Sequence, residues 1–538
     1  MPALPKADAS LAISTYLILK RLLFGSQESA VCTDLGLFPN WSRSILGSPC
    51  RVSFAWSGGI CARAVTRRES DSNLDIDWNR GNSAGVTGKP IPTVPWQGSA
   101  SRVANHGPQS STGELMKFLL PYDRKKVTVE IDDRNFLGSL ESRVETYEPN
   151  KSQQELVEAS LDNPIGSPKL EELAKGKKHI VIISSDHTRP VPSKIITPIL
   201  LRRIRSAQPD ADIKILVATG FHRPSTREEL IDKYGQEIVD REQIVMHVST
   251  DDSSMKKIGT LPSGGECIVN RLVAESDLVL SQGFIEPHLF AGFSGGRKSV
   301  LPGIASYKTI MANHCAEFIN SPNARPGILK GNPIHEDMLY AAKTAGLKFI
   351  VNVVLNGDRQ IIASFAGGLE SAHEKGCEFI ASLAAVKKIP CDITVVTNGG
   401  YPLDQNIYQG VKGLVTAEAT NKDGGVIIMV AGLSDGTGGE GFYHNLAEAK
   451  SGQDYLDKVS RVDRRHTVAD QWESQVLARI LSRHHVIMVS DLVKPEVVTG
   501  MHMEHARTFD EGIGRAYELQ GKDAKVAVIP DGLAVVVR

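Results

Sequence analysis

The sequence predicts an α/β protein with two α/β domains, largely parallel sheets and an active-site cleft between the domains. Short runs of β-branched and other apolar residues alternate with helical patterns, which is the order expected for βαβ units. The chain has 538 residues, more than one compact core usually contains, so two domains and additional segments are expected.

The predicted strands fall into two series. The first lies near His179–Ile183, Ile213–Val217, Asp277–Leu280 and residues 347–354. The second lies near Asp392–Val396, Gly425–Val430, His485–Val489 and Lys525–Ile529. Helical or glycine-rich stretches separate the strands, and a boundary falls near residues 385–391. We therefore expect an N-terminal domain over residues 116–388 and a C-terminal domain over residues 389–538 that closes the cleft, with the chain end returning to the N-terminal domain.

Residues 1–115 differ from the rest because they are rich in Ser and Gly and show no sustained helix or strand periodicity. We expect a disordered or non-native extension, followed by the alternating strand Lys126–Ile131. Two interpretations stay open. Met116 is the natural start and the preceding segment an upstream mistranslation, or the segment is a genuine tail.

A shortened chain that begins at Met116 should therefore fold and function like the full chain. Thermal unfolding of the two proteins measures this. A large drop in the melting temperature of the shortened chain would instead give the segment a structural role.

Composition excludes several classes of function. The chain has 61 basic and 62 acidic residues, so neither nucleic acid nor an anionic membrane surface is expected as a partner. The seven cysteines form no C-x-x-C pair, which indicates neither a disulfide framework nor a zinc ribbon. The apolar stretch Leu11–Phe24 contains Lys20 and Arg21 and is too short to span a bilayer. These features predict a cytoplasmic protein and leave its oligomeric state open.

Polar signatures follow the first three predicted strands. They are Ser184–Pro190, Gly220–Ser225 and the pair of segments Glu286–His288 and Ala291–Lys298. Ser225 and Glu228 have capping-box spacing, which predicts the start of the next helix. Because parallel strands end at one edge of a sheet, the three loops are expected to converge there.

Two histidines, His222 and His288, lie in separate loops of this group. A racemase needs acid/base groups on both faces of one carbon, and imidazoles titrate near neutral pH. A single loop histidine more often satisfies a carbonyl or caps a helix. Their shared position at strand ends favours the catalytic interpretation.

Arg189 and Lys412 are candidates for binding a carboxylate, the first as a bidentate fork and the second as a point charge. Tyr408 and Gln409 precede Lys412 by four and three residues, so the three side chains share one face of a predicted helix. The alternative for this face is a solvated helical surface.

Two glycine-rich segments are candidate anion sites. Ser294, Gly295, Gly296, Arg297 and Lys298 combine small residues with cations, a pattern that suits phosphate, although Walker A spacing is absent. Gly432–Gly441 lacks a clean G-x-G-x-x-G before a helix, and we interpret it as a mobile loop that borders the cleft, with a nucleotide site as the alternative.

His314 is a candidate ligand for a borderline transition metal. One histidine does not hold such an ion unaided. A three-histidine zinc site with His222 and His288 would supply the missing ligands, but it would remove both acid/base groups.

Taken in order, these motifs resemble a known family. They are D-H-T-R-P at 186–190, G-F-H-R-P at 220–224, E-P-H at 286–288, A-G-F-S-G-G-R-K-S-V-L-P-G at 291–303 and N-H at 313–314. From about residue 116 to residue 538 the chain is similar to the nickel-pincer lactate racemase family.

The resemblance implies a cofactor, pyridinium-3,5-bisthiocarboxylic acid mononucleotide, that carries nickel in its pincer. Lys298 corresponds to the lysine that tethers this cofactor covalently, and His314 to the protein ligand of nickel. Further cofactor contacts are expected from Phe290, Ser294, Gly295, Gly296 and Arg297.

The same resemblance assigns roles in the reaction. His222 and His288 correspond to the paired acid/base groups, and Asp186 supports them. Substrate contacts are expected from Arg189, Thr188, Tyr408, Gln409, Lys412 and Trp472. The implied mechanism moves the Cα hydride of a small 2-hydroxy acid, first of all lactate, to the cofactor and back to the other face of a planar keto acid. Transient partners would be the enzymes that synthesise the cofactor.

Three alternatives remain. The same machinery suits another 2-hydroxy acid such as malate or phenyllactate. An NAD-dependent dehydrogenase is disfavoured because no glycine fingerprint is followed by an acidic residue about twenty positions later. A nickel-binding module without catalysis would leave two histidines without a role.

Overall fold

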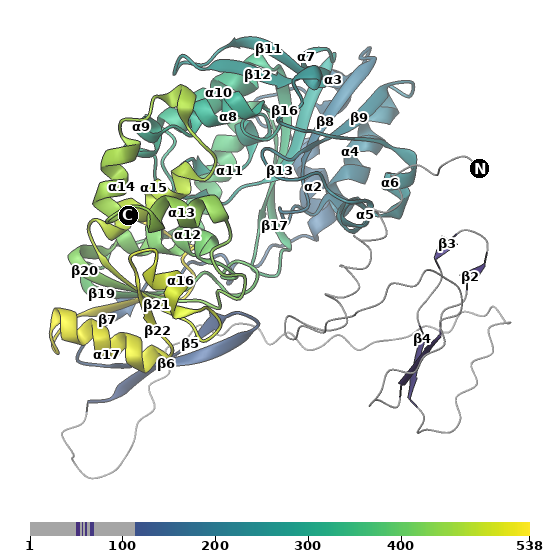
Figure 1. The fold of residues 1–538 in the computed structure, drawn as a ribbon. Coiled ribbons are helices and arrows are strands. Elements are labelled where there is room, and N and C mark those ends of the chain that lie inside the picture. The colour runs from purple at the N-terminus through teal and green to yellow at the C-terminus, as the bar shows by residue number, and fades with distance from the viewer. Residues whose placement is uncertain (1–49, 54–55, 58–59, 62–64, 69–112) are drawn as a thin grey trace, which may run out of the picture. The chain divides into compact units, whose positions relative to one another are not determined.

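A computed structural model describes residues 50–53, 56–57, 60–61, 65–68 and 113–538 (Figure 1). The first four ranges are short strands in two antiparallel pairs, β1 (Cys50–Ser53) with β4 (Val65–Arg68) and β2 (Trp56–Ser57) with β3 (Ile60–Cys61). Most of the extension expected over residues 1–115 lies outside the described residues. All that follows concerns residues 113–538.

The first lobe contains a six-stranded sheet of order β10-β9-β8-β13-β16-β17. All neighbouring strands pair in parallel except β17, which is antiparallel to β16. The strands are β8 (His179–Ser185), β9 (Asp212–Ala218), β10 (Gln243–Met246), β13 (Leu278–Phe284), β16 (Leu347–Leu355) and β17 (Ile361–Gly367). The four strands predicted for this domain correspond to β8, β9, β13 and β16.

Helices cover both faces of this sheet. In β8, Ile180 and Ile182 pack in a cluster with α4, whereas Val181 and Ile183 pack in the cluster that contains α10. Burial on both faces explains why β8 is a nearly continuous apolar run rather than an alternating one. The helices of this lobe are α2 (Gln153–Asp162), α3 (Leu170–Ala174), α4 (Ser193–Ala207), α5 (Arg227–Tyr234), α6 (Gln236–Arg241), α7 (Arg271–Ala274), α8 (Tyr307–Asn313), α9 (Ala316–Ile319), α10 (Pro333–Thr344) and α11 (Leu369–Ala384).

Short elements complete the first lobe. They are the 3-10 turns η1 (Asp252–Ser254) and η2 (Gly296–Ser299), and the antiparallel pairs β11 (Met255–Thr260) with β12 (Glu266–Asn270) and β14 (Pro287–His288) with β15 (Gly292–Phe293).

The second lobe contains a fully parallel sheet of order β22-β21-β20-β19-β23-β7. Its strands are β7 (Phe136–Ser139), β19 (Cys391–Val396), β20 (Asn421–Val430), β21 (His485–Val489), β22 (Glu504–Ala506) and β23 (Val526–Ile529). The four strands predicted for the C-terminal domain correspond to β19, β20, β21 and β23. The fold class is thus α/β with two largely parallel sheets, as predicted.

Helices α12 (Ile407–Glu418), α13 (Glu440–Ala447), α14 (Gly452–Val459) and α15 (Gln471–Leu481) belong to the second lobe, with η3 (Arg464–His466), α16 (Pro495–Thr499) and α17 (Phe509–Gln520). A long hairpin, β5 (Leu115–Tyr122) with β6 (Lys125–Asp132), packs on the same sheet face as α17. Alternate β5 residues from Met116 to Tyr122 are buried there.

The chain crosses between the lobes near both ends of residues 113–538. The two lobes are therefore not two consecutive stretches of the sequence. Residues 115–139 belong to the second lobe, because β7 pairs with β23 and the hairpin of β5 and β6 packs on the same sheet. At the other end, β24 (Val536–Val537) pairs with β18 (Ala385–Val386), and Val536 packs with Ile285 and Phe293 of the first lobe.

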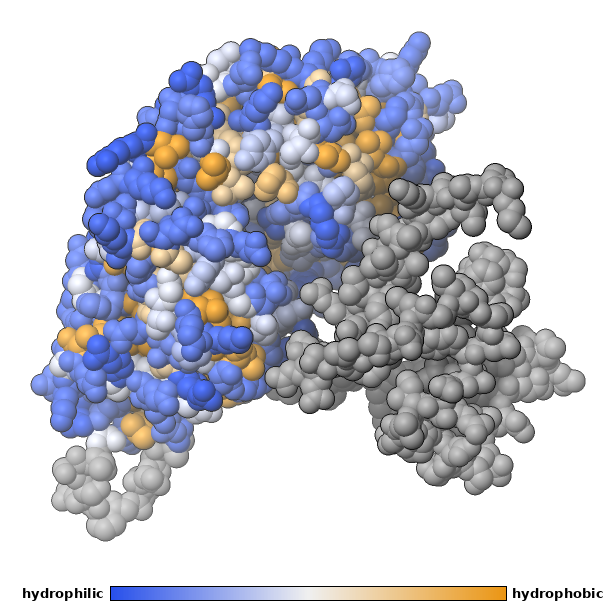
Figure 2. Space-filling model, viewed as in Figure 1, coloured by the Kyte–Doolittle hydropathy of each residue, from blue (hydrophilic) through white to orange (hydrophobic). Residues whose placement is uncertain are grey.

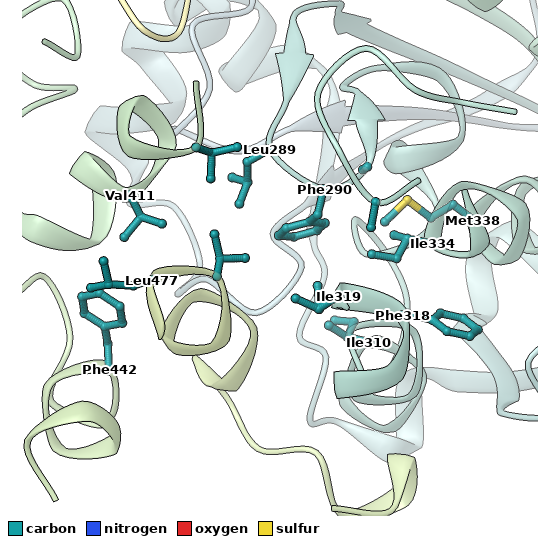
Figure 3. Close-up of a cluster of buried hydrophobic side chains, with 14 of the residues drawn as sticks. Leu289, Phe290, Ile310, Phe318, Ile319, Ile334, Met338, Val411, Phe442 and Leu477 are labelled. Carbon is teal, nitrogen blue, oxygen red and sulfur yellow. The ribbon is translucent and has the colours of Figure 1, made fainter. Parts of the chain in front are cut away.

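One hydrophobic cluster joins the lobes (Figure 3). Leu289 and Phe290 from the first lobe lie in the same cluster as Val411, Phe442 and Leu477 from the second.

The face of the molecule seen in Figure 2 is mainly hydrophilic over the described residues, with scattered apolar patches. Within these residues no helix combines the length and apolarity needed to cross a membrane. The four cysteines of residues 113–538 are free and buried.

One local feature differs from expectation. Helix α5 is capped by Thr226 with Glu229, one residue later than the predicted Ser225 and Glu228. Both pairs have the same spacing, but the Ser225 hydroxyl is used by His187 instead. The loop that follows β20 is joined to the start of α12 by backbone hydrogen bonds, Ile407 to Gly436 and Tyr408 to Thr437.

Candidate active site

The carboxyl ends of β8, β9 and β13 bring three loops to one edge of the first sheet. Hydrogen bonds link the first two loops directly. His222 Nδ1 lies 2.8 Å from Asp186 Oδ2, and Thr188 Oγ1 donates to Asp186 Oδ1 at 2.7 Å. Because a carboxylate only accepts, Nδ1 of His222 is the donor in this hydrogen bond.

Asp186 is 1% exposed, whereas the His222 side chain is 44% exposed. Burial alone would raise the pKa of the Asp186 carboxyl, but hydrogen bonds from His222 and Thr188 hold it below its ordinary value. Arg189 Nη1 in turn donates to Thr188 Oγ1 at 2.9 Å. Asp186 therefore stays ionised and orients the ring of His222.

The third loop carries His288 and Lys298, whose Nε2 and Nζ atoms are 2.8 Å apart. His288 Nδ1 faces the backbone N–H groups of Phe290 and Ala291, at 3.5 and 3.3 Å. Nδ1 therefore accepts, and Nε2 carries the proton that is shared with the lysine amine.

The surroundings of Lys298 disfavour the charged form of its amine. Burial, together with the positive charges of Arg297 and Arg189, keeps the pKa of its amine well below the ordinary value. Burial and the charge of Lys298 likewise keep the pKa of His288 well below its ordinary value. A lower pKa favours the unprotonated amine, which is the form that can act as a nucleophile.

Arg297, Ser294 and the two glycines are held by contacts within the protein. Arg297 is 1% exposed, and its guanidinium donates to the carbonyls of Phe293 and Ala291 at 2.7 and 2.6 Å. The Ser294 hydroxyl bonds to backbone atoms of the same loop.

Both glycines have positive φ angles, 78° for Gly295 and 51° for Gly296. A Cβ at Gly295 would lie 2.8 Å from Asn352 Oδ1, and one at Gly296 would lie 2.7 Å from the ring of His373. These residues therefore fix the backbone that presents Lys298.

His314 lies at the end of α8 in an aromatic environment. Its ring contacts Phe290 edge-on at 5.3 Å and Trp472 of the second lobe at 5.0 Å between centroids. Nδ1 donates to the carbonyl of Ile310 at 3.1 Å, and burial lowers the pKa of His314 to about 3. The ring is thus neutral, with the Nε2 lone pair available to a metal.

A metal site made of protein ligands alone is not formed by the described residues. Nowhere in residues 113–538 do three or more His, Cys, Asp or Glu side chains gather in a way that could hold a metal ion. The three-histidine zinc alternative, with His222, His288 and His314, is therefore not assembled. The single ligand His314 fits an ion that arrives with ligands of its own.

The second lobe contributes α12 and α15. Lys412 Nζ donates to Gln409 Oε1 at 2.7 Å, so the predicted shared helix face is present. The positive charge of Lys412 acts on Glu286, His288 and Lys298 across the lobes. Tyr408 contacts Phe442 edge-on at 5.2 Å and lies near Asp470 and Trp472.

Sequence reasoning missed two acidic groups of this site. Glu286 lies among Lys412, Arg189 and Lys298, which oppose the rise in its carboxyl pKa that burial causes. Glu473 is 2% exposed, and burial raises the pKa of its carboxyl while Lys412 opposes the rise. Glu286 stands in the E-P-H motif, but nothing local marks Glu473, since its burial depends on how α15 packs against α12.

Comparison with known proteins agrees with the motifs. The model of the lactate racemase N-terminal domain matches residues 122–327, and the model of the lactate racemase C-terminal domain matches residues 386–537. A lactate racemase of Lactiplantibacillus plantarum is 66% identical over 419 residues, 78% of this chain and 99% of that protein. A lactate racemase of Thermoanaerobacterium thermosaccharolyticum is 52% identical over 419 residues, 78% of this chain and 98% of that protein.

Solved structures point the same way. The lactate racemase apoprotein from Thermoanaerobacterium thermosaccharolyticum superposes with a TM-score of 0.76 at 51% identity, covering 78% of this chain and 100% of that one. A Thermotoga maritima protein at 19% identity and a TM-score of 0.54 shares the fold alone, over 73% of this chain and 100% of that one. With both domain models matched and relatives above half identity, the chain belongs to the lactate racemase family.

Proposed function

We propose that this protein interconverts D- and L-lactate with the nickel-pincer pyridinium cofactor attached to Lys298. The observation that carries the proposal is the presence in one site of Lys298, an amine whose pKa lies well below its ordinary value, and of a neutral imidazole, His314, whose Nε2 is free to bind a metal. Phe290 is near both residues: Lys298 Nζ lies 5.9 Å from the centre of its ring, and the centres of the Phe290 and His314 rings are 5.3 Å apart.

These residues fit the cofactor. A covalent attachment needs an uncharged amine, and nickel held by a pincer needs one further ligand from the protein. Lys298 would form the link, His314 would bind nickel and Phe290 would pack on the ring. When bound, the electron-poor pyridinium supplies a hydride acceptor next to the metal.

The chain's own residues supply orientation and proton transfer. Arg189 from the first lobe and Lys412 from the second provide the positive charges for the substrate carboxylate, with Gln409 fixing Lys412. Thr188, Tyr408 and Trp472 complete the proposed substrate contacts. His222 Nε2 accepts or returns the hydroxyl proton on one side, while Asp186 stabilises the charged ring.

His288 is proposed as the second acid/base group. In this structure its Nε2 faces the Lys298 amine at 2.8 Å. Once the amine is consumed in the covalent link, that ring nitrogen becomes available to the substrate hydroxyl. Two imidazoles on different loops then serve the two faces of a planar keto acid.

Racemisation by protein produced together with the cofactor-synthesis enzymes tests the proposal. We expect intact mass to show an adduct, metal analysis to show nickel, and chiral chromatography to show each pure enantiomer of lactate converting to the racemate. Faster conversion of malate or phenyllactate would reassign the substrate within the same chemistry. Adduct-free protein that racemises lactate without nickel would overturn the cofactor assignment.

A further inference from the structure

Helix α5 (Arg227–Tyr234) follows the His222 loop, and its last turn returns to the loop that carries Asp186 and Arg189. Lys233 Nζ donates to the backbone carbonyl of Arg189 at 3.1 Å. Lys233 is 9% exposed, although it is a lysine. The next residue, Tyr234, is 2% exposed and donates to Ser184 Oγ at 2.7 Å, which fixes this turn against the end of β8.

One turn earlier, Glu229 occupies the same face of α5 as Lys233, four residues away. Its carboxylate accepts two hydrogen bonds from Arg223, at 2.8 and 2.5 Å, and one from the Thr226 backbone at 2.8 Å. His187 Nδ1 lies 3.6 Å from the same carboxylate. One helix face therefore contacts both the loop of His222 and the loop of Arg189.

We propose that Lys233 is a positioning residue for substrate binding, which sets the place of Arg189 by holding the main chain of its loop. Arg189 is exposed, and Thr188 is the hydrogen-bond partner of its guanidinium within the described residues. The direction of the guanidinium thus depends on where the backbone of residues 188 and 189 is held. The inference rests on the proposed function, in which Arg189 binds the substrate carboxylate.

The charge of Lys233 gives this contact a pH dependence. Burial lowers the pKa of Lys233 to about 8, with Arg189 lowering it further and Asp186 and Asp232 opposing. Asp232 also faces Lys194 of α4 at 3.6 Å. As the pH rises through this value the ammonium loses its charge, and a charge-assisted hydrogen bond becomes an ordinary one of about half the strength. The loop should then hold Arg189 less firmly, and KM should rise.

Steady-state kinetics of the cofactor-loaded enzyme test the role. We expect Lys233→Met to raise KM for lactate about fivefold, the scale of one charge-assisted hydrogen bond, with kcat changed less than twofold. Lys233→Arg should restore the low KM and shift the alkaline rise in KM to higher pH. Lys194→Met, which removes a neighbouring exposed positive charge, should behave like the wild type. An unchanged KM and pH profile in Lys233→Met would overturn the inference.

Hydrogen exchange of the loop gives a readout that needs no turnover. Peptides covering residues 186–191 should exchange faster in Lys233→Met, and in the wild type at pH 9 than at pH 7 after correction for intrinsic rates. Should Lys233→Met not fold, the wild-type pH series and Lys233→Arg decide the question. Faster exchange in a protein that does not racemise lactate would sink the proposed function and keep the positioning role, whereas unchanged exchange would sink the role alone.

Discussion

Replacing Lys298 by alanine is expected to abolish both the covalent adduct and lactate racemisation. Desolvation keeps the pKa of this amine well below its ordinary value, and Arg297, Gly295 and Gly296 fix the backbone that presents it. Another lysine would have to reach the same place to rescue attachment. Lys412 of the second lobe is not expected to do so, because its amine donates to Gln409 on the same helix. Intact mass and chiral chromatography measure the two losses together.

Folding should survive this change, because removing an amine whose charge burial disfavours costs the folded state little. Lys375→Ala, at an exposed lysine on α11, is the matched control and should keep both adduct and activity. Full racemase activity in Lys298→Ala would refute the covalent cofactor assignment. It would favour a mechanism that uses a simple metal ion or a dehydrogenase chemistry.

Replacing either His222 or His288 by alanine is expected to slow racemisation in both directions by about 10²- to 10⁴-fold, the usual contribution of a general acid/base. Each enantiomer needs one imidazole to accept the hydroxyl proton and the other to return it. The roles exchange when the reaction runs backwards, so neither direction escapes. The rates are measured from each pure enantiomer, with adduct and nickel content verified first.

His179→Ala is the control, since this histidine is exposed at the start of β8, the end of the strand far from the loops. Near-normal rates in a loaded His222 or His288 variant would refute the two-base assignment. Loss of nickel from His288→Ala, with nickel retained in His314→Ala, would show that His288 is the metal ligand and His314 the acid/base group.

Most strands of both sheets could be predicted because each is a local run of apolar residues between polar loops. Strands β8, β13, β20 and β23 are of this kind, and burial on both faces of a parallel sheet demands such runs. The loops at their ends could be found for a related reason. Asp186, His222 and His288 stand within a few residues of a strand terminus, where open α/β sheets place polar side chains.

Local pattern alone did not reveal features that depend on distant partners. Strand β7 is four residues long and joins the second sheet through β23, almost 400 residues later, so no window around it carries that pairing. The capping pair of α5 shifted by one residue because His187, from another loop, takes the Ser225 hydroxyl.

A feature can be predicted from the sequence when it depends on residues that are neighbours in the chain, and not when it depends on residues that only folding brings together. Apolar periodicity and motif spacing are properties of neighbouring residues, and they carry the fold class, the strand series and the chemistry-bearing loops. Burial of a charge is a property of the packed molecule. Packing makes Arg297 a bridge between backbone carbonyls, and it places Lys233 against the backbone carbonyl of Arg189 and Glu473 near Lys412. It also brings His314 of one lobe against Trp472 of the other, because only the folded chain removes these side chains from water together.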